Sequence, residues 1–222
     1  MTGGSDMCSR YEAPTPGRLL DGFGVEVDPQ EKLDLWPGYV GPFIRKPVDS
    51  DPDDEAAPSL EGLHGVFGLL PFWAKSVKLA RSTYNARSET VATKNSYQAA
   101  WKKPRHCIIP AEAIYEPDWR TGVPIPTRIS RKDGRLLGLA GLWEKWKNPE
   151  GEIVHSYTML TINASEHEMM RNYHRPEDEK RMVVILPQGA YEDWLTASPS
   201  DSMEFMRHYP ADRLTAEPRP AR

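Results

Sequence analysis

Short apolar runs recur along the chain, and turn signals separate them. The polar turns Lys132–Gly134 and Asn148–Gly151 both end in glycine, which is typical of tight connections between neighbouring strands. Connections this short favour antiparallel pairing, because a parallel pair needs a crossover of a dozen or more residues. We expect strands at residues 63–70, 106–115, 125–130, 136–143, 155–162 and 182–186.

A few helices should flank these strands. Apolar residues recur near helical spacing after Ser88, and two further helices are expected at residues 189–196 and 200–208, the second capped by Ser200. No internal repeat divides the 222 residues. The prediction is therefore an α+β fold, one domain at residues 8–209 built on a curved, mostly antiparallel sheet.

The two ends of the chain are predicted to lie outside this domain. Residues 1–7 precede the first motif and are interpreted as a leader or a misplaced start. Residues 210–222 contain three prolines and few apolar side chains, which predicts a flexible tail.

Composition argues against a membrane protein, a secreted disulfide-bonded protein and a metalloprotein. The longest apolar runs, such as Val183–Leu186, are far shorter than the roughly 18 residues that a membrane span needs. Cys8 and Cys107 are the only two cysteines, whereas secreted domains of this size usually carry several bridged pairs. A cytoplasmic monomer is predicted. The six histidines are scattered, so neither a metal site nor a cofactor is expected.

Charge is unevenly distributed along the chain. The net charge of −4 argues against a nucleic-acid partner. Residues 75–105 nevertheless hold eight Lys or Arg against one acid, whereas residues 21–61 hold eleven acids against three bases. The basic stretch is interleaved with aromatic residues, and this combination suits phosphate neutralisation with base stacking. A solvated charged face is the alternative.

Cys8 follows Met7 close to the amino terminus. Removal of the preceding residues would expose a thiol and an α-amine on neighbouring carbons, and such an amine has a pKa of about 7.7 to 8.0. This pair condenses with aldehydes, first to an imine and then to a five-membered thiazolidine. An ordinary buried cysteine is the alternative.

Four other residues have types and positions that suit chemistry. Asn85 is placed to orient a reacting group, and Arg87 to grip a phosphate in a bidentate way; a polar turn before a helix is the alternative. Glu116 closes an apolar strand, where desolvation would raise its pKa and suit it to general-acid work. His174 precedes another strand and suits proton transfer near neutral pH. A surface carboxylate and a loop histidine remain the simpler interpretations.

Six motifs appear in a fixed order between about Cys8 and Leu186. Together they resemble the SRAP (SOS-response-associated peptidase) family. The resemblance implies that this chain has the barrel-like fold of that family. The motifs are Cys8-Ser9-Arg10-Tyr11, Phe67-Gly68-Leu69-Leu70-Pro71-Phe72-Trp73, Asn85-Ala86-Arg87-Ser88-Glu89-Thr90, Arg105 to Glu116, Ala140-Gly141-Leu142-Trp143-Glu144, and His174 with Arg181-Met182.

The resemblance implies a sensor of abasic sites in single-stranded DNA. On this interpretation Cys8 forms a covalent thiazolidine crosslink with the sugar aldehyde, and a peptidase activity removes the residues ahead of it. Glu116 assists ring opening and proton transfer, His174 handles protons during imine chemistry, and Asn85 holds nucleophile and sugar in place. The implied DNA-binding residues are Arg10, Trp73, Arg87 and Arg181.

This chain departs from the family pattern at several positions. Ser9 replaces a glycine, residues 175–180 separate His174 from Arg181 where the family has one residue, and the early turn of the family has no clean counterpart. Two other functions stay open. One is a cysteine peptidase or hydrolase with Cys8 as nucleophile, His174 as base and Asn85 as orienting group. The other is a non-catalytic module that binds single-stranded DNA.

Overall fold

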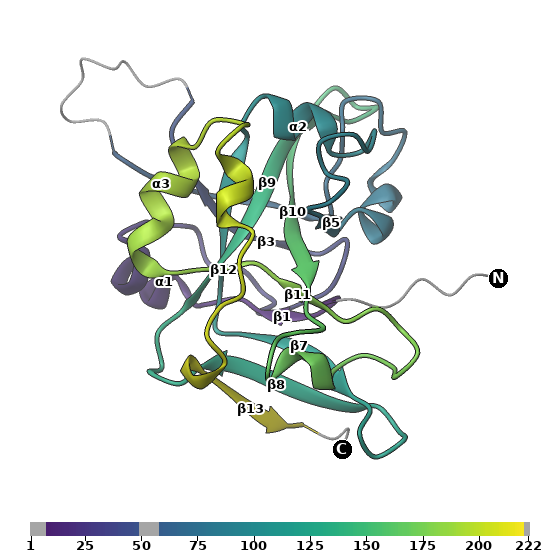
Figure 1. Ribbon diagram of the computed structural model, residues 1–222. Helices are drawn as coiled ribbons and strands as arrows, with labels where there is room; N and C mark the ends of the chain where they lie inside the picture. The colour runs from purple at the N-terminus through teal and green to yellow at the C-terminus, as the bar shows by residue number, and fades with distance from the viewer. Residues whose placement is uncertain (1–7, 49–57, 220–222) are drawn as a thin grey trace.

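Two β-sheets pack together in the computed structural model, which describes residues 8–48 and 58–219. Their arrangement is seen in Figure 1, where the smaller sheet lies below the larger one. The predicted leader at residues 1–7 lies outside the described residues. The smaller sheet has the order β13-β8-β7-β1-β2. Its strands are β1 (Tyr11–Glu12), β2 (Asp34–Leu35), β7 (Ala113–Asp118), β8 (Ile125–Arg131) and β13 (Leu214–Pro218).

The larger sheet runs in the order β11-β10-β4-β3-β6-β9-β12, and β5 pairs with β10. Because β9 also pairs with β10, the strands β10, β4, β3, β6 and β9 close into a barrel. Most pairs are antiparallel, but β10 is parallel to β4 and β5. The bounds are β3 (Val40–Arg45), β4 (Glu61–Phe67), β5 (Asn85–Arg87), β6 (His106–Ala111), β9 (Leu137–Lys147), β10 (Ile153–Asn163), β11 (Arg181–Val183) and β12 (Ile185–Leu186).

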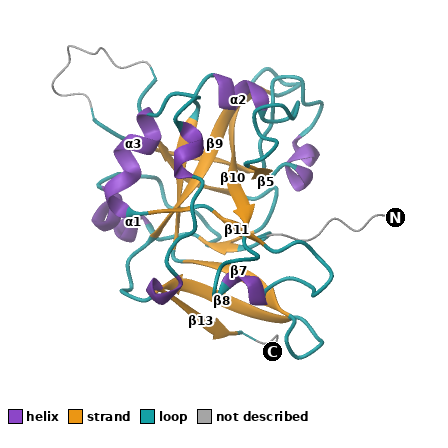
Figure 2. Ribbon diagram, viewed as in Figure 1, coloured by secondary structure: helices purple, strands orange, loops and turns teal. Residues whose placement is uncertain are grey.

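Helices lie around the outside of the strands (Figure 2). The α-helices are α1 (Pro16–Phe23), α2 (Gln98–Lys102) and α3 (Tyr191–Thr196). Shorter 3-10 helices span Val77–Ser82, Met170–Asn172, Gln188–Ala190, Ser202–Phe205 and Ala211–Arg213. Helix α3 covers β6, where the Trp194 indole N–H donates to the Cys107 carbonyl oxygen at 2.9 Å. The predicted α+β class with a curved, mostly antiparallel, barrel-like sheet and few helices is confirmed.

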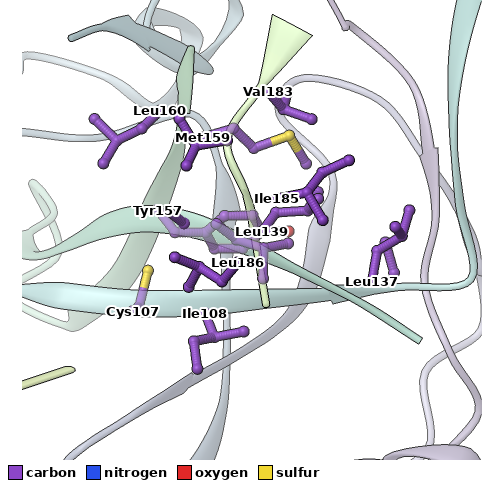
Figure 3. Packing of buried hydrophobic residues seen from close by; sticks show 14 of the residues in the cluster. Cys107, Ile108, Leu137, Leu139, Tyr157, Met159, Leu160, Val183, Ile185 and Leu186 are labelled. Atoms are coloured by element: carbon purple, nitrogen blue, oxygen red, sulfur yellow. The ribbon is translucent and has the colours of Figure 1, made fainter. Parts of the chain in front are cut away.

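The core fills the barrel and its contact with the smaller sheet. In Figure 3, Leu139 of β9 and Tyr157 of β10 lie on one side of the sheet, whereas Ile108 of β6 points to the other side. All three side chains are fully buried. At the junction of the two sheets, the hydroxyl groups of Tyr11 and Tyr157 form a buried hydrogen bond of 2.6 Å. The barrel strands are apolar on both faces, because the interior lies on one side and helices or loops cover parts of the other.

Several predicted elements differ from the observed ones. The run 106–115 is two strands in different sheets, β6 and β7, and they are separated at Glu112, whose N–H donates to the Glu12 carbonyl oxygen. The segment after Ser88 is mostly turns, and a helix begins only at Gln98. The predicted helix at 200–208 is a single 3-10 turn preceded by Asp201, so the capping role of Ser200 is wrong.

The flexible tail predicted at 210–222 is also wrong for residues 211–218. Residues 214–218 form β13, an edge strand paired with residues 127–131 of β8. Proline is tolerated at such an edge, because the strand has no further neighbour that needs its N–H group. The prolines that suggested a tail are therefore compatible with the observed strand.

Candidate active site

Four segments that are distant in sequence meet where the two sheets join. Cys8 lies three residues before β1, and Glu116 lies in β7, the neighbour of β1. His174 follows Tyr173, which forms a bridge with Asp118 at the end of β7. Asn85 opens β5 and donates from its side-chain amide to the Cys8 carbonyl oxygen at 3.4 Å. The structure thus brings together all four residues that the sequence marked as candidate catalytic groups.

Cys8 is almost completely enclosed, with 1% of its surface exposed. Burial raises the pKa of its thiol well above the ordinary value, and the negative charge of Glu116 acts in the same direction. The thiol is therefore protonated at neutral pH. Backbone hydrogen bonding by Arg10 and Tyr115 acts in the opposite direction but does not offset these two effects.

Glu116 is buried beside Cys8, with 2% of its surface exposed. Burial raises the pKa of its carboxyl group to about 7. The backbone N–H and the thiol of Cys8 both face this carboxyl group closely enough to influence its pKa. Among the described residues, however, neither oxygen has a partner in standard hydrogen-bond geometry. Such a carboxyl group exchanges a proton near neutral pH.

His174 completes the cluster, with Nε2 at 3.7 Å from Glu116 Oε2. The same nitrogen lies 3.0 Å from the Arg181 carbonyl oxygen. A carbonyl oxygen only accepts hydrogen bonds, so Nε2 carries a proton in this contact. The segment 175–180 does not move His174 away from the site.

The backbone of His174 is also unusual. Its φ angle is 66°, the only positive value at a non-glycine residue in the described part of the chain. Its N–H donates to the Pro117 carbonyl oxygen at 3.1 Å, which ties this conformation to the end of β7. Non-glycine residues with left-handed backbone are found most often at functional sites, and His174 is such a residue beside reactive groups.

The candidate DNA-binding residues differ in their exposure to solvent and in their existing partners. Arg10 forms a bidentate pair with Asp34 at 2.7 and 3.0 Å, and its guanidinium group stacks 4.0 Å from the Tyr115 ring centroid. The side chain of Arg87 is 43% exposed and pairs with Glu179 at 2.7 Å. Trp73 is 38% exposed on the loop that follows β4.

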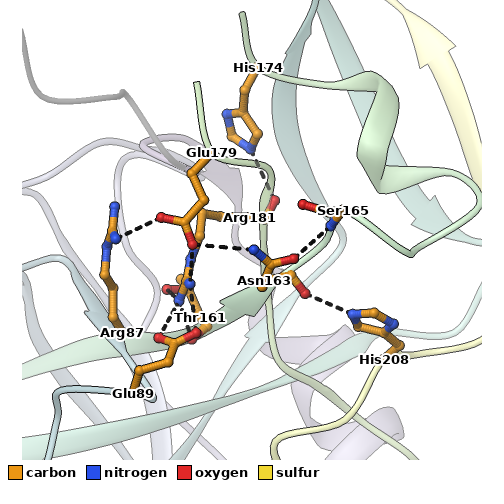
Figure 4. A network of polar contacts seen from close by, with 9 residues as sticks. All are labelled: Arg87, Glu89, Thr161, Asn163, Ser165, His174, Glu179, Arg181 and His208. Atoms are coloured by element: carbon orange, nitrogen blue, oxygen red, sulfur yellow. Dashed lines mark hydrogen bonds and ion pairs between the residues drawn. The ribbon is translucent and has the colours of Figure 1, made fainter. Parts of the chain in front are cut away.

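Arg181 is placed differently from the other candidates. Its side chain is 1% exposed, and its guanidinium group donates to Glu89, Glu179 and Thr161 (Figure 4). As the network stands, Arg181 has no open face for a phosphate, which differs from the direct contact predicted for it. Glu179 is not among the residues predicted from the sequence, because it belongs to no motif.

Within residues 8–48 and 58–219, no group of three or more His, Cys, Asp or Glu side chains is arranged to hold a metal ion. No helix in these ranges is long and apolar enough to cross a membrane.

The profile described as "SOS response associated peptidase (SRAP)" matches residues 7–220. The chain belongs to the SRAP family. Among solved structures, a protein from Bordetella bronchiseptica superimposes with a TM-score of 0.86 at 46% identity, over 96% of this chain and 100% of that one. A protein from Bacteroides thetaiotaomicron shares the fold with a TM-score of 0.77 at 21% identity, over 95% and 91% of the two chains.

Two relatives of this chain carry names that refer to abasic sites. Abasic site processing protein YoqW of Bacillus subtilis (strain 168) is 36% identical over 156 residues, which are 68% of this chain and 65% of YoqW. Abasic site processing protein HMCES of Gallus gallus is 28% identical over 207 residues, 82% of this chain and 59% of HMCES. The match to both proteins therefore spans less than two thirds of their length.

Proposed function

We propose that this SRAP-family protein processes abasic sites in DNA by capturing the sugar aldehyde covalently through Cys8. The observation that carries the proposal is the enclosed cluster of Cys8, Glu116 and His174, in which a nucleophile lies against a carboxyl group with a pKa of about 7. The names of the two relatives, which refer to abasic sites, support the same substrate.

The proposed reaction uses both nucleophiles of an amino-terminal Cys8. The α-amine adds to the C1′ aldehyde of the ring-opened sugar, and the carbinolamine loses water to give an imine. The thiol then adds to the imine carbon, forming the C–S bond as its proton passes to nitrogen. The product is a thiazolidine, and one water molecule is released overall. No oxidant or cofactor is needed.

The buried groups have matching roles in this reaction. As the sugar opens, Glu116 gives a proton to the ring oxygen and regains one from the C1′ hydroxyl group. When the second bond forms, the Glu116 carboxylate relays the thiol proton to nitrogen. His174 supplies a second proton-transfer group 3.7 Å away. Asn85 holds the Cys8 carbonyl group and so fixes the nucleophile relative to the carboxyl group. The barrel and the smaller sheet exclude water from the imine.

The proposed substrate is single-stranded DNA that contains an abasic site. Arg10 and Arg87 would neutralise backbone phosphates beside the damaged sugar, and the exposed Trp73 would stack on a base. An unpaired strand suits this arrangement, since its bases have free faces for stacking.

The proposal requires that the active form begins at Cys8. A peptide bond from Met7 to Cys8 turns the α-amine into an amide, which is not nucleophilic. Removal of residues 1–7, by this protein or another peptidase, is therefore part of the proposal. A thiol hydrolase is disfavoured, because such enzymes lower the pKa of the nucleophilic cysteine, whereas burial raises that of Cys8.

The decisive experiment mixes the protein with an oligonucleotide that contains one abasic site and follows a denaturant-resistant band. Cys8→Ala should abolish the band while DNA binding persists, because the arginines remain. Cys107→Ala is the matched control, since it removes the other buried thiol and should leave the band intact.

Mass spectrometry of the crosslinked species should show a chain that starts at Cys8. Equal bands from Cys8→Ala and the parent, or a crosslinked species that retains residues 1–7, would contradict the proposed chemistry.

A further inference from the structure

Two arginines and two glutamates form one connected network beside the active site (Figure 4). Glu179 joins the arginines, accepting from Arg87 at 2.7 Å and from Arg181 at 2.9 Å. Glu89 accepts two bonds from Arg181, at 2.7 and 2.9 Å. The four charges cancel, so the network is neutral as a whole.

The two glutamates are not equivalent. Glu89 makes a bidentate pair with Arg181, which also donates to the carbonyl and hydroxyl oxygens of Thr161. Arg181 therefore keeps most of its partners when Glu179 is removed. The Glu179 carboxylate is bound by one N–H group from each arginine and by a long contact of 3.4 Å from Asn163. Its side chain is 39% exposed.

The groups that surround the Glu179 carboxylate are also suited to bind a phosphate. A guanidinium group binds carboxylates and phosphates through the same planar arrangement of N–H donors. Both Glu179 and a phosphodiester carry one negative charge on two free oxygens. Exchange of one for the other would leave the charge balance of the network unchanged.

Glu179 is ionised in this network. Burial acts to raise its pKa, but hydrogen bonding from Arg181 and the charges of Arg181 and Arg87 prevail, so that its pKa lies below the ordinary value. The carboxylate therefore competes with an anion at neutral pH.

The segment that carries Glu179 is held at both ends, so the exchange requires a side-chain rotation. Lys180 Nζ donates to the carbonyl oxygens of His174 and Arg175. The Arg175 guanidinium group lies 5.0 Å from the centroid of the Trp119 ring. Residue 181 then begins β11, which pairs with β10.

We propose that Glu179 occupies, in the free protein, a site where Arg87 and Arg181 bind one phosphate of the DNA backbone. This inference rests on the proposed function and adds a regulated step to it. The strand binds fully only when the Glu179 side chain has rotated away, and this rotation exposes Arg181. Glu179 thus lowers the affinity for any strand that cannot displace it.

The test compares Glu179→Gln with Glu177→Gln. Both remove one negative charge from the same segment, but Glu177 is exposed and, within the part of the chain that the structure describes, forms no hydrogen bond or ion pair with either arginine. Affinity for a fluorescent oligothymidylate without damage is measured at low salt by anisotropy. E179Q should bind about three- to tenfold more tightly than the parent, and E177Q less than about twofold more tightly.

The gain should depend on Arg87. In an Arg87→Ala background, E179Q should bind no more tightly than R87A alone, because the released site lacks one of its two arginines. Thermal unfolding checks that each variant is folded. If E179Q is not folded, Glu179→Asp provides the test. The shorter side chain keeps the negative charge but withdraws the carboxylate from the two arginines, so this variant should also raise the affinity for DNA.

Equal gains in E179Q and E177Q would overturn the inference, as would weaker binding by E179Q or a gain that persists without Arg87. The abasic oligonucleotide separates this outcome from failure of the proposed function. Crosslinking without the expected affinity difference overturns the role of Glu179 alone. The affinity difference without crosslinking overturns the covalent function alone, and absence of DNA binding in every variant overturns both.

Discussion

Burial determines the protonation of the Cys8 thiol and the Glu116 carboxyl group. In both side chains it disfavours the charged form, so the free site holds a protonated thiol beside a carboxyl group that titrates near pH 7. The sequence predicted the direction of the Glu116 shift, because this residue closes an apolar strand. It did not reveal Glu179, since an ion pair between residues 92 positions apart leaves no local pattern.

Replacement of Glu116 by glutamine should change how stability depends on pH. The pKa of Glu116 rises from 4.5 to about 7 on folding. The folded protein therefore binds more protons than the unfolded chain in this interval, and its unfolding free energy falls as pH rises through it. E116Q lacks this loss. Its unfolding free energy should therefore rise by about 3 kcal/mol relative to that of the parent between pH 4 and pH 8.

Urea unfolding of E116Q and the parent at several pH values measures this gain. The absolute stability of E116Q also reflects how well an amide fits the site, so the informative quantity is the difference between the two proteins as a function of pH. A difference that stays constant from pH 4 to pH 8 would mean that Glu116 does not titrate as described.

At the scale of elements, the sequence predicted strands better than helices. Period and turn signals located most of the barrel, but they could not show that the run 106–115 divides between two sheets, because both halves are equally apolar. Helix α1 was missed although its signals were present. Thr15 caps it, Pro16 opens it and Gly24 ends it with a φ of 69°, the arrangement expected at helix ends. Short 3-10 turns lack such signals.

Gly68, at the end of β4, should tolerate no side chain. Its φ is 125°, and a Cβ atom would overlap the backbone of Ala80. Gly68→Ala should therefore lower the unfolding free energy by more than about 2 kcal/mol. Gly134→Ala is the matched control, because φ is also positive there but a Cβ atom would meet open space. It should cost only about 1 kcal/mol. Equal losses in chemical denaturation would contradict this explanation.

At the scale of the whole molecule, the site depends on how the two sheets join. Glu116 lies in the smaller sheet, and Cys8 lies three residues before β1 of that sheet. Asn85 lies in β5 of the larger sheet, and His174 lies in the loop before β11. The sequence named these four residues, yet their convergence follows from pairing between distant strands, which local patterns do not encode. The buried Tyr11–Tyr157 hydrogen bond connects the sheets close to this point.

Removal of one of these two hydroxyl groups should cost more than removal of both. Tyr11→Phe or Tyr157→Phe alone leaves a buried hydroxyl group without its partner, which costs about 1 to 3 kcal/mol. The double variant leaves no such group and should recover part of this loss. Denaturant unfolding of the four proteins measures the coupling. Additive losses would mean that the hydroxyl groups do not depend on each other.

The enclosure of Cys8 also affects how long its thiol stays reduced in a cell that contains peroxides. Peroxides attack the thiolate, so oxidation to sulfenic and then sulfinic acid follows thiolate content and exposure. The thiol of Cys8 is protonated and sealed from solvent, and both conditions slow this damage. Under the proposed function, in which Cys8 reacts once at a lesion, the enclosure preserves the thiol in its reduced form until the lesion is met.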